Sequence, residues 1–158
     1  MTTPFLSSDL RRDEGLRLRA YPDPLTGAEP WTIGYGHTGQ EVHAGLVWTP
    51  AEAETALIAD IARASALLDE HIPWWRRLDD LRQDVLANMA FNMGWLDAKG
   101  VHGLGAFHHT LDAVRESRWQ EAHDGLLASA WAHQVGDRAR RLANQMLTGA
   151  RAPEMEAA

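Results

Sequence analysis

Residues 14–38 read EGLRLRAYPDPLTGAEPWTIGYGHT, and this stretch decides the fold. In its first part, LRLRAYPDP, apolar and charged residues alternate before a proline-containing turn. Its last part is a run of aromatic and β-branched residues interrupted by glycines. Three glycines and three prolines fall between Pro22 and Gly36. Aromatic and β-branched residues favour strands, and glycine and proline favour tight turns. The stretch therefore predicts a small antiparallel sheet over residues 16–38.

Two helices are predicted on either side of this stretch. Residues 4–14 predict a short one, with Thr3 suited to cap it and Gly15 suited to end it. Thr49-Pro50-Ala51-Glu52 is a capping box, and apolar residues follow it at spacings of one, three and four. A second helix is therefore predicted from about residue 50 to His71, where Pro73 stops it.

The chain after Pro73 predicts an all-helical part. Asp137 is suited to cap the last helix and Gly149 to end it, and residues 150–158 are expected to fray. The whole chain is thus predicted as α+β and mostly α-helical, with a small β-containing lobe, a connecting helix and a larger helical lobe. The helical patterns of the last part cover residues 78–94, 106–117, 118–129 and 136–149, with a glycine-rich loop at 95–105.

Composition excludes several classes of protein. The 158 residues suffice for one compact domain, and the absence of cysteine rules out disulfides and thiolate metal sites. A formal net charge of −7 argues against nucleic acid as the main partner and against attraction to an anionic wall polymer. Because no stretch predicts a membrane span or a secretory signal, we expect a cytoplasmic protein without membrane insertion. The histidines form no zinc-binding pattern, and we expect neither a metal nor a cofactor.

Three polar residues of the first stretch are candidates for catalysis. Glu14 ends the first helix, where the negative end of the helix macrodipole disfavours a carboxylate and suits a general acid. Asp23 lies in a Pro-Asp-Pro turn, and two carboxyl groups beside a cleft are what glycoside hydrolysis needs. The hydroxyl of Thr32 can hold a water beside Asp23. Each residue also has a plainer explanation, as a solvated glutamate, a turn aspartate and a strand-forming threonine.

In combination these residues resemble the catalytic segment of the phage lysozyme (endolysin) family. The resemblance rests on Glu14-Gly15-Leu16-Arg17-Leu18, Tyr21-Pro22-Asp23, Gly27 and Thr32-Ile33-Gly34-Tyr35-Gly36-His37-Thr38. It continues in Asn88–Gly94, Arg118-Trp119, Ser129-Ala130-Trp131 and Asp137–Arg141, so that it covers roughly residues 5–150.

The resemblance implies a lysozyme-like, two-lobed fold and hydrolysis of the β-1,4 bond between N-acetylmuramic acid and N-acetylglucosamine in bacterial peptidoglycan. Glu14 is then the general acid, and Asp23 and Thr32 position the attacking water. The implied sugar contacts are Thr38, Phe91 and Thr110. We expect one lysozyme domain over residues 1–158, with an N-terminal lobe at about 14–60, a connecting helix at about 50–71, and a C-terminal lobe at about 72–150 that includes helix 4–14.

Two further residues are expected to support the site. The resemblance places Arg138 near Glu14, where its guanidinium would favour the carboxylate and oppose the helix macrodipole. We predict that His37 pairs with an acid on the long helix, with Asp60 as the candidate. The plainer explanation of His37 is a solvated histidine.

The sequence also departs from the family. The turn between Asp23 and Thr32 is longer, the loop after Gly94 is extended, and Gly125 stands where the family can carry a polar sugar contact. The alternatives are a lytic transglycosylase, which cuts the same bond without water, and a non-catalytic wall-binding or phage structural protein. Asp23 and Thr32 together favour hydrolysis, and a threonine that holds the water favours inversion. The family further implies a monomer that stays in the host cytoplasm until a holin releases it to the cell wall.

Overall fold

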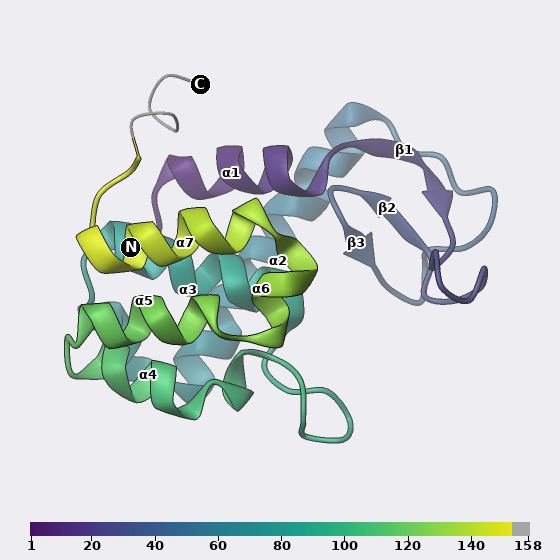
Figure 1. Cartoon of the computed structure of the whole chain (residues 1–158). Coiled ribbons are helices and arrows are strands. Elements are labelled where there is room, and N and C mark those ends of the chain that lie inside the picture. The colour runs from purple at the N-terminus through teal and green to yellow at the C-terminus, as the bar shows by residue number, and fades with distance from the viewer. Residues whose placement is uncertain (153–158) are drawn as a thin grey trace. The chain divides into compact units, whose positions relative to one another are not determined.

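The computed structural model describes residues 1–152. Their contacts divide the chain into two compact units. One unit is Pro4–Arg63, and the other joins Met1–Thr3 to the chain from Ala64 onward. The described residues form seven α-helices and one three-stranded antiparallel sheet, which confirms the predicted α+β, mostly helical class (Figure 1).

The unit Pro4–Arg63 contains the predicted first helix and the predicted sheet. Its elements are α1 (Pro4–Glu14), β1 (Arg17–Tyr21), β2 (Thr32–Gly34), β3 (His37–Thr38) and the first part of α2 (Pro50–His71). Helix α1 ends where Gly15 adopts a φ of +70°, a conformation that favours glycine. The strands lie in the order β1-β2-β3.

The register of the sheet separates a core face from an open face. Thr32 pairs with Tyr21 on β1 and with Thr38 on β3, and Ile33 pairs with His37. Ile33 is fully buried and packs in a small core with Ala20 and Val42. Because side chains alternate along a strand, Thr32 and Thr38 lie together on the opposite face.

Helix α2 begins with the capping box that the sequence predicted. The backbone N–H of Glu52 donates to Thr49 Oγ1 and that of Thr49 donates to Glu52 Oε1, both at 3.2 Å. Arg11 of α1 donates two hydrogen bonds of 2.7 and 2.8 Å to Glu54, which lower the pKa of that carboxyl. These contacts hold α1 and the start of α2 together. The helix ends at His71, as predicted.

The second unit consists of helices that pack on one another. Helix α5 packs against α4, α6 and α7, and α7 also packs against α3. Figure 1 shows α4, α5 and α7 side by side. Helix α3 is the most enclosed, because eight consecutive residues from Gln83 to Ala90 are buried. The elements are η1 (Pro73–Arg77), α3 (Asp80–Met93), η2 (Leu104–Ala106), α4 (His108–Arg115), α5 (Trp119–Leu127), α6 (Ala130–Val135) and α7 (Asp137–Thr148).

Three details of this helical unit differ from the prediction. Helix α6 was not predicted, although Ser129 caps it by accepting a hydrogen bond from the Ala132 N–H. Asp137 does not cap α7, because Gly136, with a φ of +60°, both ends α6 and precedes α7, so Asp137 is already helical. Arg151 is buried, whereas residues 150–158 were expected to fray. Residues 153–158 lie outside the described part of the chain.

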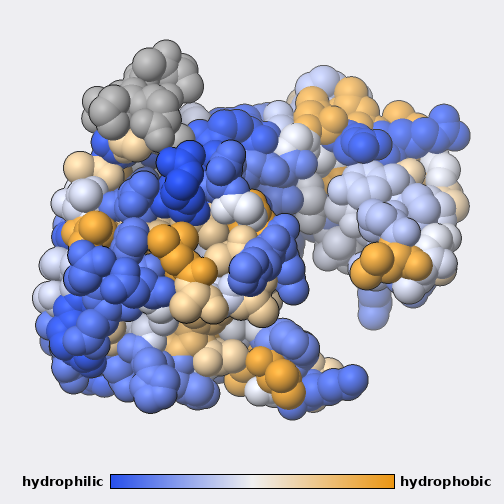
Figure 2. All heavy atoms as spheres, in the orientation of Figure 1, coloured by the Kyte–Doolittle hydropathy of each residue, from blue (hydrophilic) through white to orange (hydrophobic). Residues whose placement is uncertain are grey.

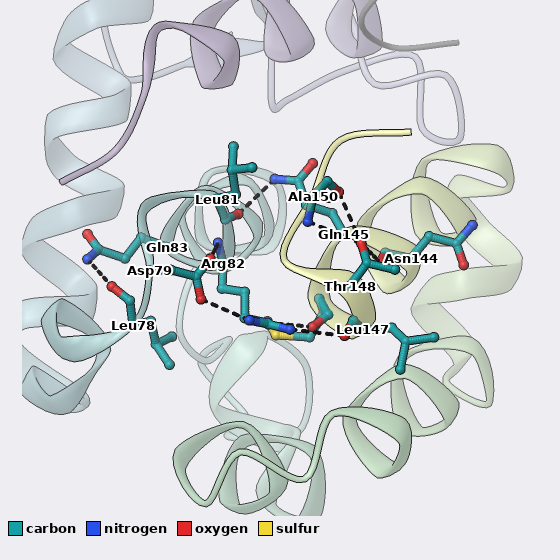
Figure 3. Close-up of polar contacts among 11 residues, drawn as sticks. Leu78, Asp79, Leu81, Arg82, Gln83, Asn144, Gln145, Leu147, Thr148 and Ala150 are labelled. Atoms are coloured by element: carbon teal, nitrogen blue, oxygen red, sulfur yellow. Dashed lines mark hydrogen bonds and ion pairs between the residues drawn. The ribbon is translucent and has the colours of Figure 1, made fainter. Parts of the chain in front are cut away.

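Arg82 joins the start of α3 to the end of α7 (Figure 3). Its guanidinium donates to the carbonyls of Met146 at 2.7 Å and Leu147 at 2.9 Å, and to Asp79 at 3.0 Å. It also lies 3.8 Å from the centre of the Trp119 ring. The last carbonyls of a helix lack partners within the helix, so Arg82 acts as a side-chain cap for α7.

The face of the molecule drawn in Figure 2 is mostly polar. Figure 2 shows hydrophobic residues in small, separate patches on the face in view. Within residues 1–152, no helix combines the length and the apolar character that crossing a membrane requires. The same residues contain no cluster of three or more histidine, aspartate or glutamate side chains arranged to hold a metal ion.

Candidate active site

Glu14 lies at the last position of α1, and its carboxyl group touches the turn between β2 and β3. A Cβ atom added to Gly36 would lie 2.6 Å from Glu14 Oε2, so any side chain at position 36 would force the Glu14 carboxyl to move. Gly36 also has a φ of +72°, which other residues rarely adopt. Gly36 thus suits this position both by its backbone conformation and by the room that it leaves for the Glu14 carboxyl.

Thr32 and Thr38 stand on either side of this turn. They are cross-strand partners, so their side chains are neighbours on the open face of the sheet. Thr32 is half-buried and Thr38 is exposed. The hairpin therefore brings the two predicted threonines together and holds Glu14 against its turn.

Asp23 lies two residues beyond Tyr21, the β1 partner of Thr32. Its Oδ1 accepts a 2.7 Å hydrogen bond from the Leu25 N–H, and its backbone bonds to Gly27 and Ala28. These contacts close the start of the long turn between Asp23 and Thr32 and fix the direction of the Asp23 carboxylate. Asp23 thus stabilises the turn through Oδ1, as expected of an aspartate in a turn. This contact is compatible with a second role for its Oδ2.

His37 pairs with Asp60 of α2, as predicted from the sequence. Its Nδ1 lies 2.8 Å from Asp60 Oδ2, and its Nε2 lies 2.6 Å from Glu41 Oε1. Arg63 forms an ion pair with the other side of Asp60. The sequence analysis missed Glu41, although its spacing of four residues from His37 offered a hint. Together these contacts fix the segment after β3 to the long helix.

This arrangement predicts a pH response of Glu41. The hydrogen bond from His37 lowers the pKa of Glu41 below its ordinary value of 4.5. The stability that this carboxylate contributes is therefore complete above pH 4.5 and is lost as the pH falls through the lowered pKa. A ¹³C NMR titration of the side-chain carboxyl measures this pKa directly.

The variant His37→Asn is expected to bring the pKa of Glu41 back toward 4.5. His43→Asn is the matched control, because His43 is exposed and its Nδ1 lies 3.0 Å from the Ala44 carbonyl, away from Glu41 Oε1. A wild-type Glu41 that titrates at its ordinary value would show that the contact is absent in solution.

The other predicted site residues belong to the helical unit. Phe91 is half-buried on α3. Thr110 is buried on α4, and a Cβ on Gly125 of α5 would collide with its hydroxyl, so this glycine gives the threonine its room. Arg138 is buried on α7 and donates from Nε to Asn88 Oδ1 at 3.0 Å. The sugar contacts, and the closeness of Arg138 to Glu14, stay predictions.

Comparison with known protein families identifies the family of the chain. The model of the family described as phage lysozyme matches residues 11–149. The chain belongs to the phage lysozyme family. This match includes every candidate residue of the phage lysozyme site, from Glu14 to Arg138.

The relatives that the chain is similar to carry different names. The chain is 33% identical to the pre-baseplate central spike protein Gp5 of Enterobacteria phage T4, over 89% of this chain and 27% of that protein. It is 40% identical to an endolysin of Acyrthosiphon pisum secondary endosymbiont phage 1, over 54% of each chain. It is 26% identical to the probable T4-type lysozyme 1 of Dictyostelium discoideum, over 89% of this chain and 92% of that one. The chain thus spans about a quarter of the spike protein and about half of this endolysin.

Proposed function

We propose that this protein is a peptidoglycan hydrolase that cleaves the β-1,4 bond between N-acetylmuramic acid and N-acetylglucosamine. The observation that carries the proposal is the position of Glu14, which ends α1 with its carboxyl against Gly36, in the turn that joins the strands of Thr32 and Thr38. All three predicted catalytic residues belong to the unit Pro4–Arg63. Membership of the phage lysozyme family supports the same activity.

In the proposed mechanism the acid and the water act on opposite sides of the bond. Glu14 donates its proton to the glycosidic oxygen, and the bond to the anomeric carbon breaks as the leaving sugar departs. Thr32 and Asp23 hold a water, and Asp23 accepts its proton while the water oxygen attacks the anomeric carbon. This single displacement inverts the anomeric configuration. A β anomer as the first product would contradict inversion.

The name of one relative supports a second candidate role. A protein similar to a central spike of a phage baseplate can act on the wall as part of a phage particle, or can be a structural piece that does not cut. The endolysin relatives support lysis of the host. For this role we propose a monomer that remains in the cytoplasm until a holin releases it. The proposed activity is the same in the lytic role and in a cutting spike.

Mass spectrometry of digested Gram-negative peptidoglycan tests the activity. We expect fragments that end in reducing N-acetylmuramic acid, because water completes the reaction. Anhydro ends would establish a lytic transglycosylase instead. If the folded protein releases no fragments, the binding or structural role replaces the hydrolase.

Gly36→Ala tests the contact between the turn and Glu14. The new methyl group would lie 2.6 Å from Oε2 and displace the carboxyl, and a displacement of about 1 Å can cost about 100-fold in rate. Gly45→Ala is the matched control, because Gly45 also has a positive φ, +87°, but has nothing within 4 Å of the added atom. Both variants are expected to lose about 1 kcal/mol of stability from backbone strain. Equal initial rates of peptidoglycan cleavage in the two variants would refute the role of this contact.

A further inference from the structure

A groove in the unit Pro4–Arg63 lies next to the candidate catalytic residues. Its volume is about 560 Å³, within the range of about 300–1,000 Å³ that is typical of small-molecule sites. One wall is the end of the long turn, at Glu29, Pro30 and Trp31, and the other wall is the segment from Thr38 to Val42. Thr38 is the cross-strand partner of Thr32, so the groove begins one strand away from the predicted water-holding residue.

The wall that starts at Thr38 is held in place by contacts at both of its ends. His37, just before it, bonds to Asp60 of α2 and to Glu41 within the wall. At the far end, Val42 is buried in the core of the sheet, and its N–H donates to the Gly39 carbonyl at 3.1 Å. This explains why a buried histidine holds two carboxylates here.

The opposite wall is held by the same core and by its own turn. Trp31 is half-buried and packs against the cluster formed by Ala20, Ile33 and Val42. Thr26 Oγ1 donates to the Glu29 carbonyl at 3.4 Å, and the Asp23 N–H donates to the Ala28 carbonyl at 2.9 Å. Because both walls are already fixed, they lose little conformational entropy when a ligand binds.

The side chains that line the groove suit a neutral sugar ring. The indole of Trp31 offers an apolar surface, and Thr38 and Gln40 offer hydrogen-bonding groups at the rim. A pyranose ring has the matching character, with an apolar C–H face and polar groups around its edge. Glu29 is the ionisable residue among those that line the groove, and its carboxylate accepts from hydroxyls but repels another carboxylate.

We infer that this groove binds one N-acetylglucosamine ring of the glycan strand and discriminates against the acidic N-acetylmuramic acid. The inference rests on the proposed function, because the alternation of these two sugars is a property of peptidoglycan. It assigns Glu29, Trp31 and Gln40, which have no part in the proposed chemistry, to recognition of the neutral sugar. The long turn between Asp23 and Thr32 thereby becomes one wall of a binding site.

Chitotriose, a neutral oligomer of N-acetylglucosamine, is the direct probe. In ¹H–¹⁵N spectra of the full chain, we expect it to shift the indole N–H of Trp31, assigned through Trp31→Phe, and the side-chain amide of Gln40. Gln40→Ala is expected to weaken binding about three- to tenfold, as the loss of one hydrogen bond does. Gln134→Ala, a change at an exposed glutamine of the helical unit, is the matched control and should bind as the wild type does.

The selectivity is tested with free N-acetylmuramic acid and free N-acetylglucosamine. The wild type should bind N-acetylglucosamine more tightly than N-acetylmuramic acid. In Glu29→Gln the ratio of these two affinities should be smaller. The inference would be overturned if chitotriose shifted other signals but not those of Trp31 and Gln40. Equal affinities of Gln40→Ala and Gln134→Ala for chitotriose would also overturn it. If the protein cuts peptidoglycan but chitotriose does not shift the signals of Trp31 and Gln40, the groove is refuted as a sugar site and the proposed hydrolase activity stands. A protein that binds chitotriose here but cuts nothing refutes the hydrolase and leaves the groove as a sugar site.

Discussion

Glu14→Gln is expected to lower the rate of peptidoglycan cleavage by about 10²–10⁴-fold, the usual contribution of a general acid. The glutamine amide fills the same space against Gly36 but carries no proton that it can give to the glycosidic oxygen. Binding of the glycan should change little, because shape and polarity are kept. The initial rate of release of soluble fragments and the affinity for intact cell walls measure the two effects separately.

The matched control is Glu70→Gln, the same chemical change at an exposed residue near the end of α2. It should cleave at the wild-type rate. A Glu14→Gln protein that is folded, binds walls and cuts them within about threefold of Glu70→Gln would remove Glu14 from the mechanism.

Arg82→Leu is expected to destabilise the protein by about 2–4 kcal/mol, because it removes charge-assisted hydrogen bonds and a contact with an aromatic ring. The carbonyls of Met146 and Leu147, at the end of α7, lose their donor (Figure 3). Trp119 loses the guanidinium that covers its ring. The guanidinium is largely buried, with 13% of the side chain exposed, so water replaces these bonds poorly. Urea unfolding followed by circular dichroism measures the loss.

Arg77→Leu controls for this change, since Arg77 is an exposed arginine five residues earlier. Its effect should stay within about 0.5 kcal/mol. Arg82→Lys keeps the charge but not the two-pronged geometry, so it should fall between wild type and Arg82→Leu. Equal midpoints for Arg82→Leu and Arg77→Leu would show that the cap on α7 contributes nothing.

Local chemistry made most helix ends predictable from the sequence. The capping box at Thr49 and the final glycine at 149 act within one turn of helix, so their residue types suffice. Helix α6 was missed because six residues are too few to show a period. Asp137 was misassigned because an aspartate after a glycine suits a cap, whereas Gly136 itself makes the junction between two helices.

The site was less accessible to sequence reasoning than the helices. The roles of Glu14, Asp23 and Thr32 came from the family resemblance, since position alone left the plainer explanations open. The contact of Glu14 with Gly36 joins residues 22 positions apart, and Arg82 reaches carbonyls 64 and 65 positions away. Such contacts depend on how elements pack, which no local pattern records.

The hydrogen bonds of Thr3 have a consequence for how the protein is made. The N–H and the hydroxyl of Thr3 both donate to the buried carboxylate of Asp84, which is synthesised 81 residues later. During synthesis, the whole of Pro4–Arg63 is made before Asp84 is added to the chain. The nascent chain can therefore complete its sheet-bearing unit early. The helical unit closes later, because its residues Met1–Thr3 gain their partner only after Asp84 has been made.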